Sequence, residues 1–225
     1  MSVAVRLARV RDRIEQAASA SGRDAAAVKL VAVSKTKPPE AIREAYAAGQ
    51  RAFGENYAQE LSAKADALSD LAGLEWHFTG HVQTNKARVV AKHAQVVHTV
   101  DSAALARELG KRAVKERVTP LPVLIEVNLG REPQKAGATP SEIDEVMAAV
   151  NAQASLFLRG LMTMPPAGDL RSARAAFEAL VTLRNLHGGV AVLPELSMGM
   201  SEDLEIAVTA GATYVRVGTA IFGER

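Results

Sequence analysis

The side chain whose position most strongly suggests chemistry is Lys35, in the stretch LVAVSKTKP at residues 30–38. The apolar run of residues 30–33 is typical of a strand that is covered on both faces. Lys35 follows that run, where a barrel or an open α/β sheet carries its active site. Burial and neighbouring cations such as Arg216 or Lys37 would lower the pKa of this amine and let it attack a carbonyl carbon. The plainer interpretation is a solvated lysine at a strand end.

Two glycine-rich segments near the end of the sequence predict a phosphate site. They read LSMGMSEDLE at residues 196–205 and VRVGTAIFG at residues 215–223. Glycines let backbone N–H groups approach an anion closely, and Ser197, Ser201 and Thr219 add hydroxyl donors. Tight turns without a ligand would also use such glycines, and the acidic pair Glu202 and Asp203 weighs against an anion. With Lys35, a phosphate site would suit a phosphorylated carbonyl compound held as a Schiff base.

The elements that position these residues alternate along the chain. Helical patterns lie between apolar, strand-like runs near residues 29–35, 50–53, 75–79, 96–100, 121–127, 157–162, 192–197 and 213–217. This predicts one α/β domain over residues 1–225, a (β/α)8 TIM barrel preceded by an extra N-terminal helix. A flavodoxin-like or Rossmann sheet is the rival, but the chain has neither a G-x-G-x-x-G motif nor a Walker sequence.

Local signals mark where several helices begin and end. Thr139 and Glu142 have capping-box spacing before a helix, and Ser201 is placed to cap another that Gly211 ends. At the N-terminus, apolar residues recur at helical spacing from residue 3 to residue 14. That spacing favours an amphipathic helix over a targeting segment, so we expect a cytoplasmic protein.

The composition excludes several classes of protein. Lysine and arginine number 27 against 25 acidic residues, and aromatic residues make up only 4%, so a nucleic-acid partner is not expected. Cysteine is absent, which removes disulfides and thiolate metal sites. The pair His77 and His81 has no cysteine or paired carboxylate on its strand, so no metal is expected. No apolar run is long enough to cross a membrane.

The motifs AVSKTKP, FGENYAQE, WHFTGHVQTNK, GLMTMPP, LSMGMSEDLE and VRVGTAIFG together resemble the YggS/PROSC family of pyridoxal 5′-phosphate (PLP) homeostasis proteins. The resemblance covers about residues 3–225. It implies a barrel similar to the N-terminal domain of alanine racemase, without the racemases' second domain. It also implies PLP bound through Lys35, and a monomer.

The same resemblance implies further contacts with the cofactor. Lys35 is joined in that set by Asn56, His77, Ser197, Met198, Ser201, Arg216, Gly218 and Thr219. Ser201, Gly218 and Thr219 would hold the phosphate, and Arg216 would face the pyridine nitrogen. Asn56 could equally form a turn, and His77 could equally be a core histidine. Thr79 replaces the family's more usual isoleucine, a change expected to matter little, and Lys135 in the matching loop 130–137 has no evident role.

Three functions remain open at this stage. The first is a carrier and regulator of PLP that affects amino-acid or keto-acid pools, serves PLP-dependent recipient enzymes and turns over little substrate. The second is an amino-acid racemase or another PLP enzyme, and the third is a lysine Schiff-base aldolase without a cofactor. The resemblance favours the carrier, since racemisation needs two proton donors that flank the cofactor and Lys35 supplies one.

Overall fold

The computed structural model describes residues 1–130, 136–165 and 168–224. Its eight strands pair in parallel, each with its neighbours in the sequence, and the last pairs with the first to close a barrel. The strands are β1 (Lys29–Val33), β2 (Ala52–Glu55), β3 (Glu75–Phe78), β4 (Val96–Val100), β5 (Leu121–Glu126), β6 (Leu156–Met162), β7 (Glu195–Ser197) and β8 (Tyr214–Val217). The prediction of a (β/α)8 barrel is confirmed.

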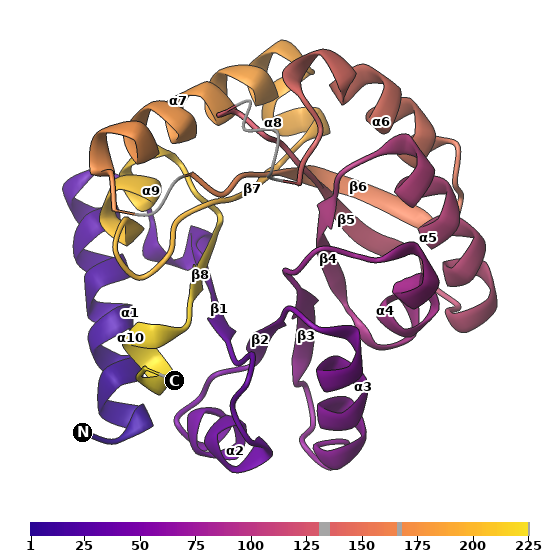
Figure 1. Cartoon of the computed structure of the whole chain (residues 1–225). Coiled ribbons are helices and arrows are strands. Elements are labelled where there is room, and N and C mark those ends of the chain that lie inside the picture. The colour runs from indigo at the N-terminus through magenta and orange to yellow at the C-terminus, as the bar shows by residue number, and fades with distance from the viewer. Residues whose placement is uncertain (131–135, 166–167, 225) are drawn as a thin grey trace.

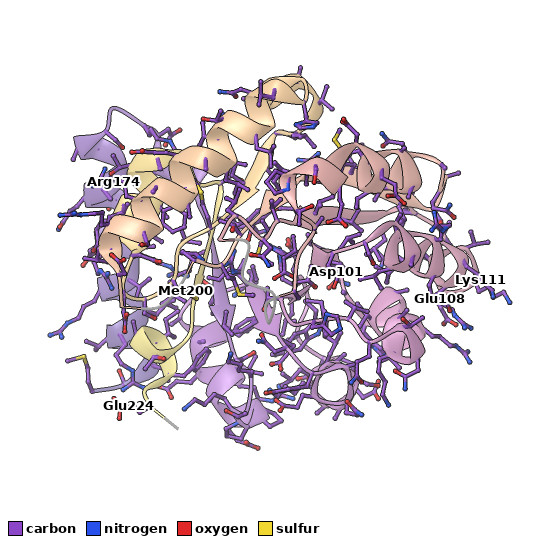
Figure 2. All side chains as sticks on the ribbon, turned by 45° about the horizontal axis from the view of Figure 1, so that its top comes forward. Asp101, Glu108, Lys111, Arg174, Met200 and Glu224 are labelled. Atoms are coloured by element: carbon purple, nitrogen blue, oxygen red, sulfur yellow. The ribbon has the colours of Figure 1, made fainter. Side chains whose placement is uncertain are left out.

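Helices surround this barrel on the outside (Figure 1). They are α1 (Val3–Ala20), α2 (Pro39–Ala47), α3 (Ala58–Ala67), α4 (Ala87–His93), α5 (Ala103–Glu116), α6 (Ile143–Asn151), α7 (Leu170–Leu186), α8 (Gly189–Val192), α9 (Leu204–Ala210) and α10 (Thr219–Phe222). Three 3₁₀ turns are interspersed, at Ala25–Ala27, Thr84–Lys86 and Pro140–Glu142. Charged side chains of α5 such as Glu108 and Lys111 lie on the outer surface (Figure 2).

The extra N-terminal helix α1 packs beside the final segments of the chain. Its predicted apolar face is buried, including Leu7 and Val10, and it contacts α2, α9 and α10. The Arg6 side chain donates to the carbonyl of Ile221 on α10, which holds the two ends of the described chain side by side (Figure 1). The helix thus completes the outer layer where the barrel closes.

Two apolar layers hold the barrel together. The outer layer lies between the strands and the helices. The inner one fills part of the barrel and contains Val31, Ala52, Val96, Leu124, Met162 and Tyr214. Because side chains alternate along a strand, the same inward positions toward the carboxyl ends can carry the polar residues of a site.

Two local predictions are corrected and one is confirmed. Thr139 and Glu142 form the capping box, which opens a 3₁₀ turn that continues into α6. Ser201 does not cap α9, since that helix begins at Leu204 after Asp203. The strand expected from residue 192 begins only at Glu195, because Gly188 adopts the left-handed conformation and starts the short helix α8.

Candidate functional site

A cavity of about 250 Å³ lies at the carboxyl ends of the strands, in the mouth of the barrel. Six of the nine predicted site residues line it: Lys35, Asn56, Ser201, Arg216, Gly218 and Thr219. The segments after β6 and β7 supply further lining residues, among them Met164, Asp169, Leu170, Met200 and Asp203. Met200, on the segment that follows β7, is labelled in Figure 2.

Lys35 is half-buried and sits on a short backbone segment that is held on both sides. On one side, the carbonyl of Ser34 accepts a hydrogen bond of 2.8 Å from Nζ of Lys64. On the other, the N–H of Thr36 donates to Oε2 of Glu60 at 2.7 Å. Thr36 has φ of 62°, a left-handed conformation that a β-branched residue rarely adopts. The surrounding contacts therefore impose the backbone geometry that presents Lys35.

The Lys64 ammonium is the centre of this support. It lies 2.8 Å from Oε1 of Glu55 and 2.8 Å from Oε2 of Glu60, and its side chain is 8% exposed. The hydroxyl of Ser34 donates to Oε1 of Glu55 at 2.6 Å. Burial raises the pKa of Glu55, while Lys64 and Ser34 act in the opposite direction. Burial also opposes ionisation of Glu60, but Lys64 and the Thr36 N–H hold the pKa of that carboxyl below its usual value.

Arg216 is buried and fixed within the barrel. Its Nη1 donates to Oγ of Ser197 at 2.6 Å and its Nη2 donates to the carbonyl of Thr163 at 3.0 Å. Burial lowers the pKa of Arg216 to about 10, so the guanidinium stays protonated at neutral pH. The prediction that Arg216 points inward on the same side as Gly218 agrees with both residues lining the cavity.

The glycine-rich segments meet at the junction of β7, β8 and β1. A Cβ atom at Gly218 would lie 3.2 Å from the carbonyl oxygen of Val33, so glycine lets the start of α10 approach β1 closely. Oγ of Ser201 accepts a hydrogen bond of 3.4 Å from the N–H of Ala220. Arg13 of α1 donates to the Ser201 carbonyl at 2.9 Å, which ties this loop to the outer layer.

Glu202 and Asp203, the acidic pair that weighed against an anion site in the sequence, also line this part of the cavity. Glu202 is exposed, whereas Asp203 is buried and its Oδ1 accepts from the N–H of Met200 at 2.5 Å. The Asp203 carboxylate therefore shapes the loop that carries Ser201.

Thr79 forms a hydrogen bond with Asn56 that the sequence did not predict. The Thr79 hydroxyl donates to Oδ1 of Asn56 at 2.9 Å, and both residues line the cavity. Gly80 makes this possible, because a Cβ there would lie 2.2 Å from the backbone oxygen of Asn56. An isoleucine at position 79 could not donate this bond.

The other three predicted residues, His77, Ser197 and Met198, are fully buried and do not line the cavity. His77 lies inside the barrel against His98. Ser197 lies between His98 and Arg216. Met198 belongs to the outer apolar layer. Their direct contact with a cofactor stays a prediction, and for His77 the position fits the alternative of a core histidine.

The sequence drew attention to two lysines in addition to Lys35, namely Lys37 and Lys135. The Lys37 ammonium donates to the backbone oxygens of Gly223 and Glu224, at 3.1 and 2.8 Å, and does not line the cavity. The Lys37 ammonium is thus directed to backbone oxygens near residue 224, and its effect on Lys35 stays a prediction. Lys135 lies outside the described residues.

His77 and His81, the two histidines considered as metal ligands, differ in burial. His77 is buried, whereas His81 is exposed with Nδ1 3.1 Å from Oδ2 of Asp101. Within residues 1–130, 136–165 and 168–224, no group of three or more histidine and acidic side chains is placed to hold a metal ion. In the same residues, no helix is both long and apolar enough to span a membrane.

Comparison with known proteins places this site in a family. The model of the alanine racemase N-terminal domain matches residues 5–225. A Pseudomonas aeruginosa protein named pyridoxal phosphate homeostasis protein is 47% identical over 226 residues, which cover 100% of this chain and 96% of that protein. The chain belongs to the pyridoxal phosphate homeostasis protein family. The resemblance seen in the sequence motifs is thereby confirmed.

Solved structures agree with this assignment. PipY of Synechococcus elongatus, solved with PLP bound, is 39% identical with a TM-score of 0.85, and the match covers 99% of this chain and 100% of that chain. Alanine racemase from Corynebacterium glutamicum is 19% identical with a TM-score of 0.69, and the match covers 96% of this chain and 61% of that chain. The second likeness shows the shared barrel fold.

Proposed function

We propose that this chain carries PLP in the mouth cavity, as a Schiff base on Lys35, and takes part in PLP homeostasis with little catalytic turnover. The observation that supports this most is the convergence of Lys35, Arg216 and the two glycine-rich segments on one cavity. The neutral amine of Lys35 adds to the aldehyde carbon and one water molecule leaves. PipY, which shares the fold, has been solved with PLP bound.

The chemistry of the lining residues fits the groups of PLP. Lys35 offers an amine for the aldehyde, and Ser201 and Thr219 offer hydroxyls for the phosphate beside the glycine at position 218. Arg216 offers a fixed donor for the ring nitrogen. The exposed Glu202 and the buried Asp203 are the features that fit an anion least, and Asp203 is already engaged by the N–H of Met200.

Arg216 gives a physical reason for low turnover. Bound PLP supplies an electrophilic aldehyde and an electron-withdrawing ring. The ring withdraws electrons most strongly when its nitrogen carries a proton, which an acidic partner would favour. A guanidinium can only donate a hydrogen bond, so Arg216 would keep that nitrogen unprotonated.

The test is an absorption spectrum of the purified protein with PLP, before and after borohydride, followed by peptide mapping. We expect a yellow protein with one reduced pyridoxyl adduct, on Lys35. Lys35→Ala should lose the adduct, whereas Lys37→Ala should retain it, because the Lys37 ammonium points to backbone oxygens near residue 224. A colourless protein that takes up no added PLP would contradict the proposal and would suit the cofactor-free aldolase.

A racemase or another PLP enzyme is separated from a carrier by turnover. Racemase and transaminase assays over a panel of amino acids should show exchange on the cofactor with negligible product. A rate of about 1 per second or faster lies in the ordinary range of enzymes and would refute the carrier.

The wider setting is proposed on the same basis. Residues 1–225 would act as one PLP-binding domain, as a monomer in the cytoplasm, with amino or keto acids and PLP-dependent recipient enzymes as partners. Nucleic acid and membrane surfaces are not proposed as partners.

A further inference from the structure

Beneath Arg216, three buried side chains form a chain of hydrogen bonds across the barrel interior. Nδ1 of His77 on β3 lies 2.8 Å from Nε2 of His98 on β4. Nδ1 of His98 lies 2.8 Å from Oγ of Ser197 on β7, which accepts from Arg216 on β8. All three side chains are fully buried, and their polar atoms find partners within the protein except Nε2 of His77, which has no hydrogen-bond partner among the described residues.

The Arg216 end of this chain fixes the direction of every bond. A guanidinium can only donate, so Oγ of Ser197 accepts from it. If Oγ of Ser197 also accepted from His98, its own buried hydroxyl hydrogen would have no acceptor among the described residues. The bond that satisfies every group runs from the Ser197 hydroxyl to an unprotonated Nδ1 of His98. Nε2 of His98 then carries the hydrogen and donates to Nδ1 of His77.

The charge at the other end favours the same direction. The remaining nitrogen of His77, Nε2, lies 3.6 Å from Oε2 of Glu75 at the amino end of the barrel. Contact with His77 and with the Lys29 ammonium lowers the pKa of Glu75 to about 2, so this carboxylate is ionised at neutral pH. A hydrogen on Nε2 of His77 faces that negative charge favourably, whereas a lone pair there would be repelled.

Both rings are held neutral and in place. Burial lowers the pKa of His77 and of His98, and protonation of His98 is further opposed by the nearby His77 ring and by the Arg216 charge. A doubly protonated ring would have no acceptor nitrogen and would break the chain. The Tyr214 ring packs edge-on against both imidazoles, with centroids 5.5 and 5.1 Å away, which restricts their rotation.

We propose that His77, His98 and Ser197 are positioning residues that hold the Arg216 guanidinium in the cavity through a relay of fixed direction, with both histidines in the Nε2–H tautomer. The relay is a property of the chain itself. Only its effect on PLP rests on the proposed function.

The direct test is nitrogen NMR of ¹⁵N-histidine-labelled protein without PLP, at pH 7. His77 and His98 should each show a protonated Nε2 and an unprotonated Nδ1. His187 is an internal control for a protonated Nδ1, because this nitrogen lies 2.8 Å from the backbone oxygen of Leu183 and must donate to it, while its Nε2 lies 3.2 Å from Oδ1 of Asp144. A protonated Nδ1 on His77 or His98, or averaging between tautomers, would overturn the proposal.

A pair of variants tests the effect on Arg216. Ser197→Ala removes the acceptor, so the guanidinium protons of Arg216 should exchange with solvent at least tenfold faster and PLP should bind about tenfold more weakly. Thr99→Val is the matched control, because Thr99 is next to His98 in the sequence but its buried hydroxyl donates to the backbone oxygen of Gly80 and takes no part in the relay. It should leave Arg216 exchange within twofold of wild type, even if it lowers stability.

The two proposals fail in different ways. Unchanged Arg216 exchange in Ser197→Ala would overturn the positioning role while leaving PLP binding intact. Wild-type protein that binds no PLP would contradict the proposed function and leave the tautomers unaffected.

Discussion

Replacing Lys64 with methionine would leave the buried Glu55 carboxylate without its cationic partner, beneath the segment that carries Lys35. The Glu55 side chain is fully buried and its Oε1 is held by Lys64 and Ser34. Its Oε2 has no hydrogen-bond partner among the described residues. Methionine fills a similar volume but removes the charge and the donors. Glu55 must then either stay ionised without a counter-charge or take up a proton.

The response of Glu55 with the lower free-energy cost determines how much the variant is destabilised. Breaking a buried ion pair by removing one partner costs about 3–5 kcal/mol. Protonating a carboxyl whose unfolded pKa is about 4.3 costs about 3.7 kcal/mol at pH 7 and about 1 kcal/mol at pH 5. We therefore expect Lys64→Met to lower the free energy of unfolding by about 3–4 kcal/mol at pH 7, plus about 1 kcal/mol at either pH for the lost bond to the Ser34 carbonyl.

The sign of the pH effect follows from proton uptake. Burial already raises the pKa of Glu55 in the wild type, and removing Lys64 raises the folded-state pKa further above its unfolded value. The folded state then binds more protons, and stability falls as pH rises from about 4.3 toward that raised pKa. The difference from wild type should consequently shrink by more than half between pH 7 and pH 5.

Urea unfolding followed by circular dichroism at both pH values measures this difference. Lys92→Met, at an exposed lysine of α4, is the matched control and should change stability by less than about 0.5 kcal/mol. Adding Glu55→Gln to Lys64→Met should abolish the pH dependence, because the stranded charge is gone. Equal losses at pH 5 and pH 7, or a pH dependence that survives in the double variant, would refute the reasoning.

Two further predictions concern the cavity and its surroundings. Burial and the charge of Asp101 raise the pKa of Glu126 to about 7, so wild-type stability should fall relative to Glu126→Gln by about 2–4 kcal/mol between pH 5 and pH 8. Parallel urea-unfolding curves across that range would contradict this. Thr79→Val should weaken PLP binding about threefold to tenfold in a spectroscopic titration, because it removes one hydrogen bond from Asn56. Unchanged affinity would mean that Asn56 needs no support.

Patterns along a single strand predicted the positions that matter most. The apolar run before Lys35 placed it at the mouth of the barrel, and the alternation of β8 placed Arg216 on the same side as Gly218. These inferences use only spacing along the chain, which a strand converts directly into direction. The closed barrel then brought β8 beside β1, so the two glycine-rich segments and Lys35 share one cavity.

Contacts between strands were not predictable in the same way. Lys64 has helical spacing from Glu60, but nothing local indicates that its ammonium also reaches Glu55 and the Ser34 carbonyl. The meeting of His77 with His98 depends on the stagger between β3 and β4, which sequence spacing does not reveal. Thr79 seemed a neutral replacement because its hydroxyl had no partner until the turn at Gly80 was known.

The closure of β1 against β8 also has a consequence for how the protein is made. Lys35 follows β1 and leaves the ribosome well before Arg216, Gly218 and Thr219, which lie on or just after β8. Contacts between such distant segments form late in folding, because the chain loses the entropy of closing the long loop before the contacts stabilise the fold. A nascent chain therefore has Lys35 long before it has the rest of the cavity that Lys35 lines. On the proposed function, uptake of PLP would accordingly report that β8 has been synthesised and has closed the barrel against β1.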